Sequence, residues 1–175
     1  MRRLTDPDRL KAFMRGLAAA ARHEGRVYFT GGATALLLGW RSATVDIDIA
    51  LEAESDEMLR AIPELKERLE VNVELASPAD FIPELPGWRE RSTFIDRIGK
   101  LDFYHYDFSA QALSKIERGH DLDMKDVGEM LDRGLVAAEK LLELFECIEP
   151  ELFRYPAIDP VSYRRRVEEV ARRRA

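Results

Sequence analysis

The segment that most constrains the fold is a strand-like pattern that carries two aspartates one residue apart. Asp46 and Asp48 alternate with Val45, Ile47 and Ile49. Residues i and i+2 of a β-strand point to the same face, so the two carboxylates are expected side by side and the three aliphatic side chains in the core. Neighbouring carboxylates repel each other unless a cation lies between them. Oxygen ligands of this kind suit Mg²⁺ or Mn²⁺, which we expect as the cofactor.

A glycine pair precedes the aspartates by one short predicted helix. Residues 27–30 form a short apolar strand pattern, Gly31 and Gly32 follow, and residues 33–38 are a brief apolar helix pattern. Glycine lets the backbone approach a ligand closely, and the N–H groups at the start of a helix attract an anion. Together with the adjacent carboxylates, this arrangement predicts that the glycines hold a phosphate group that a metal ion bridges.

Metal-assisted phosphoryl or nucleotidyl transfer commonly uses a third carboxylate from a neighbouring strand. The pattern over 69–75 predicts such a strand, with Val71, Val73 and Leu75 on one face and Asn72 and Glu74 on the other. Glu74 is therefore the expected third ligand, although a solvated strand residue is an equally good interpretation. Asn72 and Asp102 are weaker candidates for the same position.

The order of the predicted elements indicates an α+β fold, with a mixed sheet flanked by helices and a helical C-terminal part. Asp6 and Pro7 are typical of a helix start, and Gly99 of a hairpin turn. Later helices are predicted over 110–118, 123–133 and 135–148 and from residue 161. We expect an α/β core over 1–108 and a helical region over 109–175 that packs on it.

Composition narrows the class of protein. The formal net charge of the 175 residues is −6, so the whole chain is not a general nucleic-acid binder. Its single cysteine, Cys147, cannot form an internal disulfide, which favours a reducing compartment, and we interpret it as a packing residue. No apolar run has the length of a membrane span, and the N-terminus lacks a signal sequence, so we expect a soluble cytoplasmic protein.

The central motifs resemble a known superfamily. Gly31-Gly32, thirteen further residues and Asp46-Ile47-Asp48 match the signature of the nucleotidyltransferases with the polymerase-beta-like fold. Phe29-Thr30-Gly31-Gly32-Ala33 and Arg41-x-x-Thr44 resemble the bacterial branch of AbiEii-type and MenA-type toxins and related uncharacterised nucleotidyltransferases. A looser similarity covers 112–131, where Lys115, Arg118, Asp123 and Asp126 are similar to that branch's downstream lysine and Asp-x-x-Asp elements.

This resemblance implies roles for individual residues. Asp46, Asp48 and Glu74 would bind the metal, and Lys115 and Asp123 would complete the catalytic set. The nucleotide-binding residues would be Thr30, Gly31, Gly32, Arg41, Thr44 and Lys115. The implied reaction moves a nucleoside monophosphate from an NTP to an acceptor hydroxyl and releases pyrophosphate. Asp123 also has a structural interpretation as a helix N-cap.

Several functional alternatives stay open. The acceptor would be RNA, in particular tRNA, or a protein. The protein would act as the toxin of a toxin–antitoxin or phage-defence pair with a cognate antitoxin. The competing class is a non-catalytic member that binds a nucleotide or a partner. The arginines of the C-terminal segment indicate a solvated helix face or a contact with RNA phosphates. The intact carboxylate pair favours catalysis.

Overall fold

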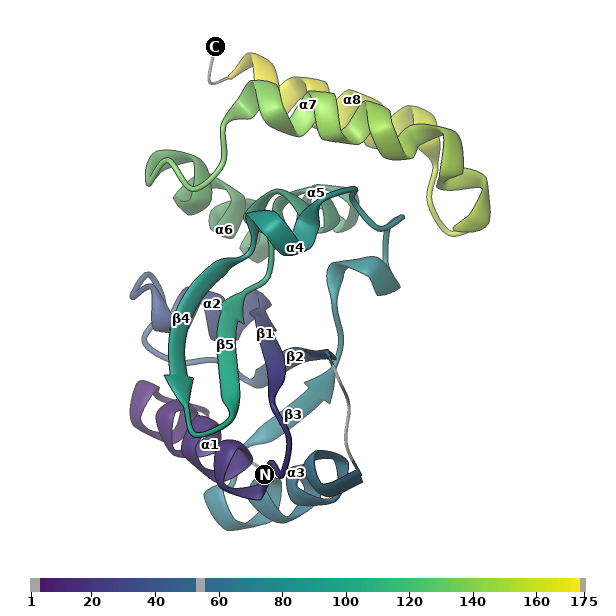
Figure 1. Cartoon of the computed structure of the whole chain (residues 1–175). Helices are drawn as coiled ribbons and strands as arrows, with labels where there is room; N and C mark the ends of the chain where they lie inside the picture. Colours follow the sequence, from purple (N-terminus) through teal and green to yellow (C-terminus); the bar gives the residue numbers. More distant parts are fainter. Residues whose placement is uncertain (1–3, 53–55, 174–175) are drawn as a thin grey trace. The chain divides into compact units, whose positions relative to one another are not determined.

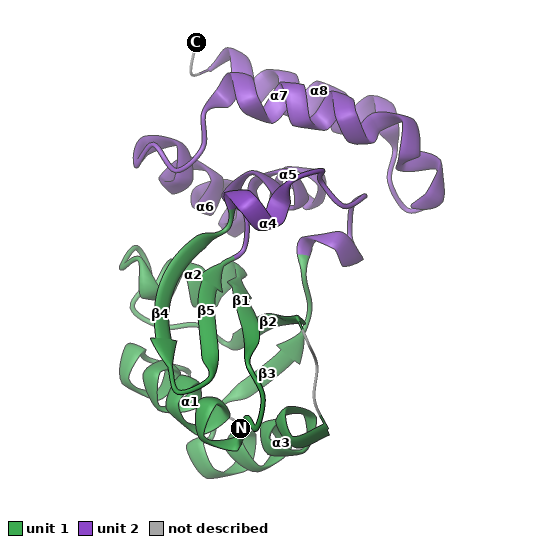
Figure 2. Ribbon diagram, in the orientation of Figure 1, with its two compact units in different colours: residues 1–77, 92–105 green, residues 78–91, 106–175 purple. Residues whose placement is uncertain are grey.

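The computed structural model describes residues 4–52 and 56–173. The chain forms two compact units (Figures 1 and 2), and both are discontinuous in sequence. Unit 1 comprises residues 1–77 and 92–105, and unit 2 comprises residues 78–91 and 106–175. A five-stranded mixed sheet and helices, including C-terminal helices, confirm the predicted α+β class.

The sheet lies entirely in unit 1. Its strands are β1 (Gly25–Thr30), β2 (Asp46–Glu52), β3 (Asn72–Leu75), β4 (Thr93–Ile98) and β5 (Leu101–His105). Their order is β3-β2-β1-β5-β4. β1 is antiparallel to β2 and parallel to β5, β2 is parallel to β3, and β4 is antiparallel to β5. The predicted hairpin that turns at Gly99 is therefore confirmed, and β1 and β2 are direct neighbours.

Three helices pack on one face of the sheet (Figure 1): α1 (Pro7–Ala20), α2 (Gly31–Leu37) and α3 (Asp56–Leu69). The Asp6 carboxylate accepts a hydrogen bond from the Arg9 amide, which confirms the predicted cap of α1. α3 continues through Pro63 to Leu69, and Glu70 then adopts a φ of 53°. This left-handed residue ends the helix, so the following strand begins at Asn72 and not at residue 69.

The alternation of side chains along the strands separates an apolar face from a polar one. Val27, Phe29, Ile47, Ile49 and Phe103 are buried in the core with the three helices. Val45 was predicted to share that core, but it precedes β2 and is 64% exposed. Arg26, Tyr28, Thr30, Asp46, Asp48, Asn72, Glu74, Phe94, Asp102 and Tyr104 occupy the alternate positions. We call this second surface the carboxylate face of the sheet.

Unit 2 is helical. It contains η1 (Pro78–Asp80), α4 (Trp88–Arg91), α5 (Phe108–Arg118), α6 (Asp121–Asp132), α7 (Ala138–Ile148), η2 (Glu149–Arg154) and α8 (Pro160–Arg172). In the proline-rich segment 77–88, Ile82, Leu85 and Trp88 are buried, while Phe81 is 42% exposed. Trp88 stacks on Tyr106 with ring centroids 4.2 Å apart.

Two sequence-based interpretations in unit 2 are wrong. Cys147 is exposed and does not pack in the core. Asp123 is not the N-cap of α6, because this helix begins at Asp121 with His120 in the cap position. Asp123 lies within the first turn and is buried, where its carboxylate forms ion pairs.

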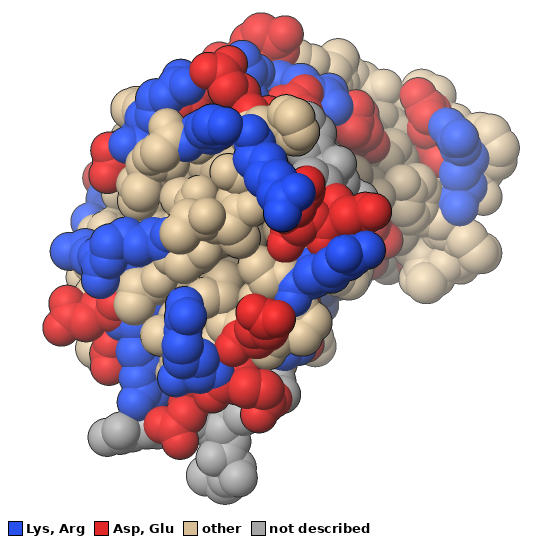
Figure 3. All heavy atoms as spheres, turned by 60° about the horizontal axis from the view of Figure 1, so that its bottom comes forward, with Lys and Arg blue, Asp and Glu red and all other residues tan. Residues whose placement is uncertain are grey.

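The surface carries charges of both signs. On the face shown in Figure 3, blue and red side chains alternate around uncharged areas, and neither sign forms a continuous field. This mixture agrees with the modest net charge. Among the helices of the described residues, none has both the length and the apolar character that crossing a membrane requires.

Candidate active site on the carboxylate face

The two aspartates of β2 share one side of the sheet, as predicted. Ile47 and Ile49 are fully buried on the core face, while Asp46 and Asp48 alternate with them and are half-buried. The core side chains therefore determine the direction of the two carboxylates, since a shift of one residue along the strand would exchange the faces. The apolar partners keep both acids on the opposite face of β2, a strand paired on both of its edges.

The neighbouring strands add polar groups at the same level. In the register, Asp48 lies between Thr30 of β1 and Glu74 of β3, and Asp46 lies beside Asn72 of β3. Asp102 lies across from Arg26, at the other end of β1 from Thr30, and forms an ion pair with Arg97. Of the two acidic candidates for a third ligand, Glu74 is therefore the one adjacent to Asp48.

Asn72 connects the acids of β2 and β3. Its Nδ2 donates hydrogen bonds to Asp46 Oδ1 at 2.6 Å and to Glu74 Oε1 at 3.2 Å. An amide is neutral and has two N–H donors, so it satisfies two carboxylates without adding charge. The sequence indicated Asn72 only as a substitute ligand, and its bridging role depends on the register of β2 and β3.

Gly31 and Gly32 are the first residues of α2 and make two close approaches. Gly31 has a φ of +58°, and a Cβ on it would lie 2.9 Å from Asp48 Oδ2. A Cβ on Gly32 would lie 2.0 Å from Thr44 Oγ1 and 3.4 Å from Arg41 Nη1. Only glycine fits at either position. Because neither residue has a side chain, the start of α2 can lie close to Asp48 and to the segment that leads into β2.

Thr44 fixes the entry to β2. Its hydroxyl donates to the Asp46 carbonyl at 3.0 Å, and its backbone pairs with Thr5 through two hydrogen bonds of 2.8 and 2.9 Å. Thr44 is buried. Of the residues predicted to bind the nucleotide, Thr30, Gly31, Gly32, Arg41 and Thr44 thus lie around Asp46 and Asp48 in unit 1.

A buried histidine supports α2 from the core side. The Thr34 hydroxyl donates to the Phe29 carbonyl at 3.1 Å, and His105 Nδ1 lies 3.2 Å from the same hydroxyl oxygen. Because the hydroxyl proton is directed to Phe29, His105 Nδ1 is assigned as the donor. Burial lowers the pKa of His105 to about 4, so the ring is neutral at pH 7. The position of His105 is structural, since the ring is buried and takes part in this hydrogen bond.

Lys115 and Asp123 belong to a buried ion network of unit 2. Lys115 Nζ donates to Asp126 Oδ2 at 2.7 Å and to Asp123 Oδ1 at 3.1 Å, and Arg118 Nη2 lies 2.7 Å from Asp123 Oδ1. Lys115, Asp123 and Asp126 are at most 6% exposed. Two cations and two carboxylates balance in charge and join α5 to α6. The roles of Lys115 and Asp123 toward a nucleotide stay predictions.

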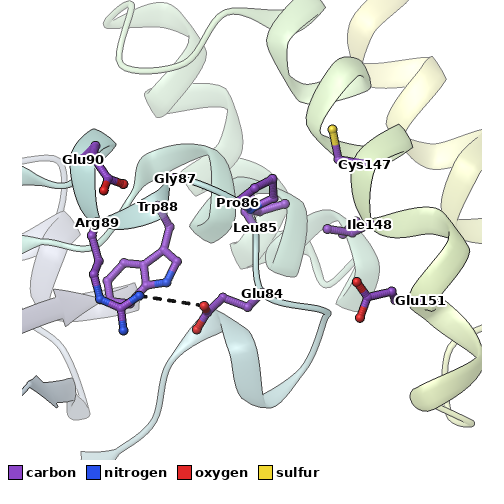
Figure 4. A pocket seen from close by; sticks show the side chains of 10 residues that line it. All are labelled: Glu84, Leu85, Pro86, Gly87, Trp88, Arg89, Glu90, Cys147, Ile148 and Glu151. Carbon is purple, nitrogen blue, oxygen red and sulfur yellow. Dashed lines mark ion pairs between the residues drawn. The ribbon is translucent and has the colours of Figure 1, made fainter.

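A separate hollow lies within unit 2 (Figure 4). It has a volume of about 320 Å³ and is lined by segment 84–90 together with Cys147, Ile148 and Glu151. The Arg89 guanidinium lies over the Trp88 ring, 4.4 Å from its centroid, and pairs with Glu84 at 3.9 Å. Glu84, Glu90 and Glu151 make this hollow acidic. It contains none of the predicted site residues.

The donor set on the carboxylate face fits Mg²⁺. Across residues 4–52 and 56–173, no cluster of three or more His, Cys, Asp or Glu side chains converges as a complete metal site. Mg²⁺ does not need such a cluster, because it usually binds one or two carboxylates and takes its other ligands from water and substrate phosphates. Asp46 and Asp48 supply two carboxylates on one face of β2, and Glu74 adds a third in the neighbouring register position.

A mixed sheet with an aspartate pair on its second strand, beside a helix that begins with two glycines, is consistent with a nucleotidyltransferase-like fold. Comparison with known families agrees. Residues 9–170 match the family model DUF6036, described as a nucleotidyltransferase of unknown function, and the chain belongs to this family. No curated protein and no solved structure matches the chain. The match supports the nucleotidyltransferase superfamily and leaves the AbiEii/MenA branch a prediction.

Proposed function

We propose that this protein is a Mg²⁺-dependent nucleotidyltransferase whose metal site is formed by Asp46, Asp48 and Glu74. The observation that carries the proposal is the register, which puts Glu74 of β3 beside Asp48 on the face that also presents Asp46. Two acids of β2 and one of β3 occupy neighbouring positions on the same face, so negative charge is concentrated in this part of the sheet. A bound divalent cation and a nucleotide phosphate offset this charge, which a purely structural surface would have no reason to concentrate.

The chain's own residues would position the reacting groups. Asp46 and Asp48 are held by the buried side chains between and beyond them, and Asn72 orients Asp46 through its 2.6 Å hydrogen bond. The start of α2 at Gly31 gives a nucleotide phosphate access to the backbone beside Asp48. Arg41, which lies close to Gly32, supplies positive charge at this end of the sheet.

The proposed reaction is attack of an acceptor hydroxyl oxygen on the α-phosphorus of an NTP. The new bond joins the acceptor oxygen to the α-phosphorus, the bond from the α-phosphorus to the bridging oxygen breaks, and pyrophosphate leaves with that electron pair. Bound Mg²⁺ would neutralise phosphate charge and favour the departure of pyrophosphate. Solvent or a carboxylate would take the acceptor's proton.

The first experiment is transfer of label from each α-³²P-NTP, with Mg²⁺, to total RNA or to lysate protein. We expect labelled RNA for an RNA or tRNA acceptor and labelled protein for protein nucleotidylation. Asp48→Asn removes charge with little change of volume, so it should abolish transfer and Mg²⁺-dependent NTP binding while the protein stays folded. Asp56→Asn is the matched control, since Asp56 is exposed at the start of α3 and is none of the predicted site residues.

Glu74→Gln tests the third ligand, with exposed Glu64→Gln of α3 as its control. We expect transfer to fall by about 10²-fold or more in Glu74→Gln and to stay unchanged in Glu64→Gln. Transfer at the wild-type rate in Glu74→Gln would remove Glu74 from the site. Mg²⁺-dependent NTP binding without any transfer would favour the alternative of a non-catalytic nucleotide-binding or partner-binding member.

We further propose that the nucleotidyltransferase acts as a toxin. This role rests on the resemblance of the Gly-Gly and Asp-x-Asp motifs to those of toxin nucleotidyltransferases. If the protein is such a toxin, its induced expression in a bacterial host arrests growth and the Asp48→Asn variant does not. Co-expression of a neighbouring gene that encodes an antitoxin would relieve the arrest. Equal growth with wild-type protein and Asp48→Asn would contradict the toxin role and leave the transferase proposal intact.

A further inference from the structure

The carboxylate face also carries a row of aromatic side chains beside the acids. Tyr28 of β1, Tyr104 of β5 and Phe94 of β4 occupy paired positions across three neighbouring strands. Tyr28 and Tyr104 stack with ring centroids 5.3 Å apart, and Phe94 meets Tyr104 edge to face at 5.6 Å. We call these three residues the aromatic row.

The inner part of the row is held firmly. Tyr28 is 1% exposed, and its hydroxyl donates to Glu52 at 2.8 Å, which fixes the ring against Tyr104. Tyr104 is half-buried between its two aromatic neighbours. Rigid aromatic side chains lose little conformational entropy when a ligand binds, so a row of this kind is preorganised for stacking.

Cross-strand packing joins all three rings, but it covers the outer one only in part. Phe94 lies on the edge strand β4 and is 53% exposed. An exposed aromatic side chain on a sheet edge loses hydrophobic stabilisation and invites aggregation. The exposed part of the Phe94 ring is open to a planar ligand that stacks on it.

Two arginines place positive charge beside the row. The Arg26 guanidinium carbon lies 5.8 Å from the Tyr104 ring centroid, and Arg97 continues the same face of β4. Both side chains are half exposed, and each pairs with acids, Arg26 with Glu52 at 3.7 Å and Arg97 with Asp102 and Glu24. Aromatic rings with adjacent arginines are the combination that binds single-stranded nucleic acid through its bases and phosphates.

The row lies within reach of the acids. Asp48 pairs with Thr30, and Tyr104 pairs with Tyr28, which is two residues earlier in the same strand β1. Two strand spacings and two residues of rise separate Asp48 from Tyr104 by about 12 Å. A short stretch of extended nucleotide chain covers this distance, so a base on the row and a phosphate at Asp48 can belong to one substrate.

We infer that the aromatic row is a nucleobase-stacking subsite, with Tyr104 and Phe94 as the contact residues. This inference rests on the proposed function and names the substrate chemistry that the same face would take. The base comes either from the NTP or from an unpaired nucleotide of an acceptor RNA. Both sources share the planar π-face that aromatic side chains recognise without strong sequence preference.

The test measures binding to the full chain in EDTA, so that the metal site does not contribute. The probes are a fluorescein-labelled ten-nucleotide oligo(U), the same oligonucleotide with abasic residues, and a fluorescent ATP analogue. The variants are Tyr104→Ala, Phe94→Ala and the ring-preserving Tyr104→Phe. Phe153→Ala is the matched control, because Phe153 is 80% exposed but lies in η2 of unit 2.

We expect Tyr104→Ala and Phe94→Ala to weaken binding of at least one base-containing probe by about tenfold. Tyr104→Phe and Phe153→Ala should retain wild-type affinity, and the abasic oligonucleotide should bind all proteins equally weakly. Loss confined to oligo(U) assigns the subsite to the acceptor, and loss confined to the ATP analogue assigns it to the donor base. Thermal melting of each variant verifies that Tyr104→Ala is folded, and Phe94→Ala repeats the test at an exposed position.

The binding and transfer experiments distinguish failure of the stacking subsite from failure of the transferase proposal. Wild-type affinity of both alanine variants for both base-containing probes would overturn the stacking subsite, even if Asp48→Asn abolishes transfer. The same holds if the wild-type protein binds neither probe in EDTA. If transfer is never detected but both alanine variants lose base binding, the subsite stands and the transferase proposal fails.

Discussion

At the scale of single residues, Asn72 is the position where a substitution tests the proposed metal site most directly. It is the neutral partner of Asp46 and Glu74. Replacing it by aspartate removes its N–H donors and adds a fourth carboxylate to the same part of the sheet. A cation-binding site and a plain surface respond differently to this change.

We predict that Asn72→Asp lowers the free energy of unfolding in EDTA by about 1–3 kcal/mol, because a donor is lost and like charges are added. Millimolar Mg²⁺ should restore most of this loss. The measurement is urea denaturation with and without Mg²⁺, and NaCl at equal ionic strength is the control for general screening. Equal recovery in NaCl and in Mg²⁺ would contradict a specific cation site.

His105 provides a prediction about pH. Burial lowers its folded-state pKa to about 4, below the unfolded value of about 6.5. The unfolded chain therefore takes up this proton first, and the stabilisation that is complete above pH 6.5 is lost as pH falls toward 4. At pH 4.5 the loss from this one group is about 2–3 kcal/mol.

The measurement for His105 is the change in unfolding free energy between pH 7 and pH 4.5. His105→Gln should show a smaller decrease than the wild type, by about the amount that His105 contributes. His23→Gln, at an exposed position, should keep the wild-type decrease. Identical pH dependence in wild type and His105→Gln would show that His105 is not buried in neutral form beside Thr34.

At the scale of elements, the junction between β1 and α2 is the part of the fold that depends most on residue size. A Cβ on Gly32 would lie 2.0 Å from the buried Thr44 hydroxyl, which is bonded to the Asp46 carbonyl. The conflict is with a packed segment and not with a flexible side-chain end. α2 and the entry to β2 therefore pack correctly only when position 32 has no side chain.

We predict that Gly32→Ala lowers the free energy of unfolding by about 1–3 kcal/mol through this overpacking. Gly31→Ala should cost about 1–2 kcal/mol because of its positive φ, and it should also weaken Mg²⁺ binding by displacing the Asp48 carboxylate. Gly128→Ala is the control. Gly128 lies inside α6 with nothing within 4 Å of an added Cβ, so this change should stabilise the protein by about 0.5–1 kcal/mol.

Denaturation midpoints of the three variants give a direct ranking, and isothermal titration with Mg²⁺ and an NTP separates stability from binding. Gly32→Ala at wild-type stability would contradict the close contact with Thr44. Gly31→Ala with reduced stability but normal Mg²⁺ binding would mean that Asp48 can shift without affecting the site.

The same elements show how far the sequence predicts the structure. Alternation of aliphatic and acidic residues correctly predicted the direction of Asp46 and Asp48, because side chains of a strand alternate with a period of two residues and the aliphatic set occupies the core face. The pattern over 69–75 failed at its start, since Leu69 and Glu70 fit either a helix end or a strand, and only the left-handed Glu70 decides. Aspartate is a residue type that commonly caps helices, so the sequence suggested Asp123 as an N-cap. In the structure its carboxylate instead pairs with Lys115, which comes from another helix and could not be identified as a partner from the local sequence.

At the scale of the whole molecule, the chain passes between its two units at 77/78, 91/92 and 105/106. Segment 78–91 belongs to unit 2, where Arg91 pairs with Asp107 at 2.7 Å and the Tyr155 hydroxyl donates to the Ala79 carbonyl at 3.0 Å. Composition and periodicity describe contiguous stretches, so they cannot reveal a unit assembled from separate segments. For the same reason they did not bring Tyr104 and Phe94 next to the acids, since that neighbourhood arises from strand order.

The net charge of −6 leads to a prediction about how the intact protein binds nucleic acid. Charges of both signs are mixed on the surface, so no broad basic area exists to hold a duplex on the face shown in Figure 3. Among the described strand residues of the carboxylate face, Arg26 and Arg97 are the arginines beside the aromatic row, and both are already paired with acids. Binding through this face should therefore depend on stacking more than on phosphate contacts.

We predict that the affinity for oligo(U) depends weakly on salt. With two phosphate contacts at most, the slope of log K against log of the salt concentration should be no steeper than about −1.4, since each contact on single-stranded nucleic acid contributes about −0.7. The measurement is fluorescence anisotropy between 50 and 300 mM KCl, with duplex DNA of equal length as the control ligand. A slope of about −3 or steeper would mean that a basic surface elsewhere carries the binding. In that case Tyr104→Ala and Phe94→Ala should leave both the affinity and the slope unchanged, so the two experiments together locate the nucleic-acid contact.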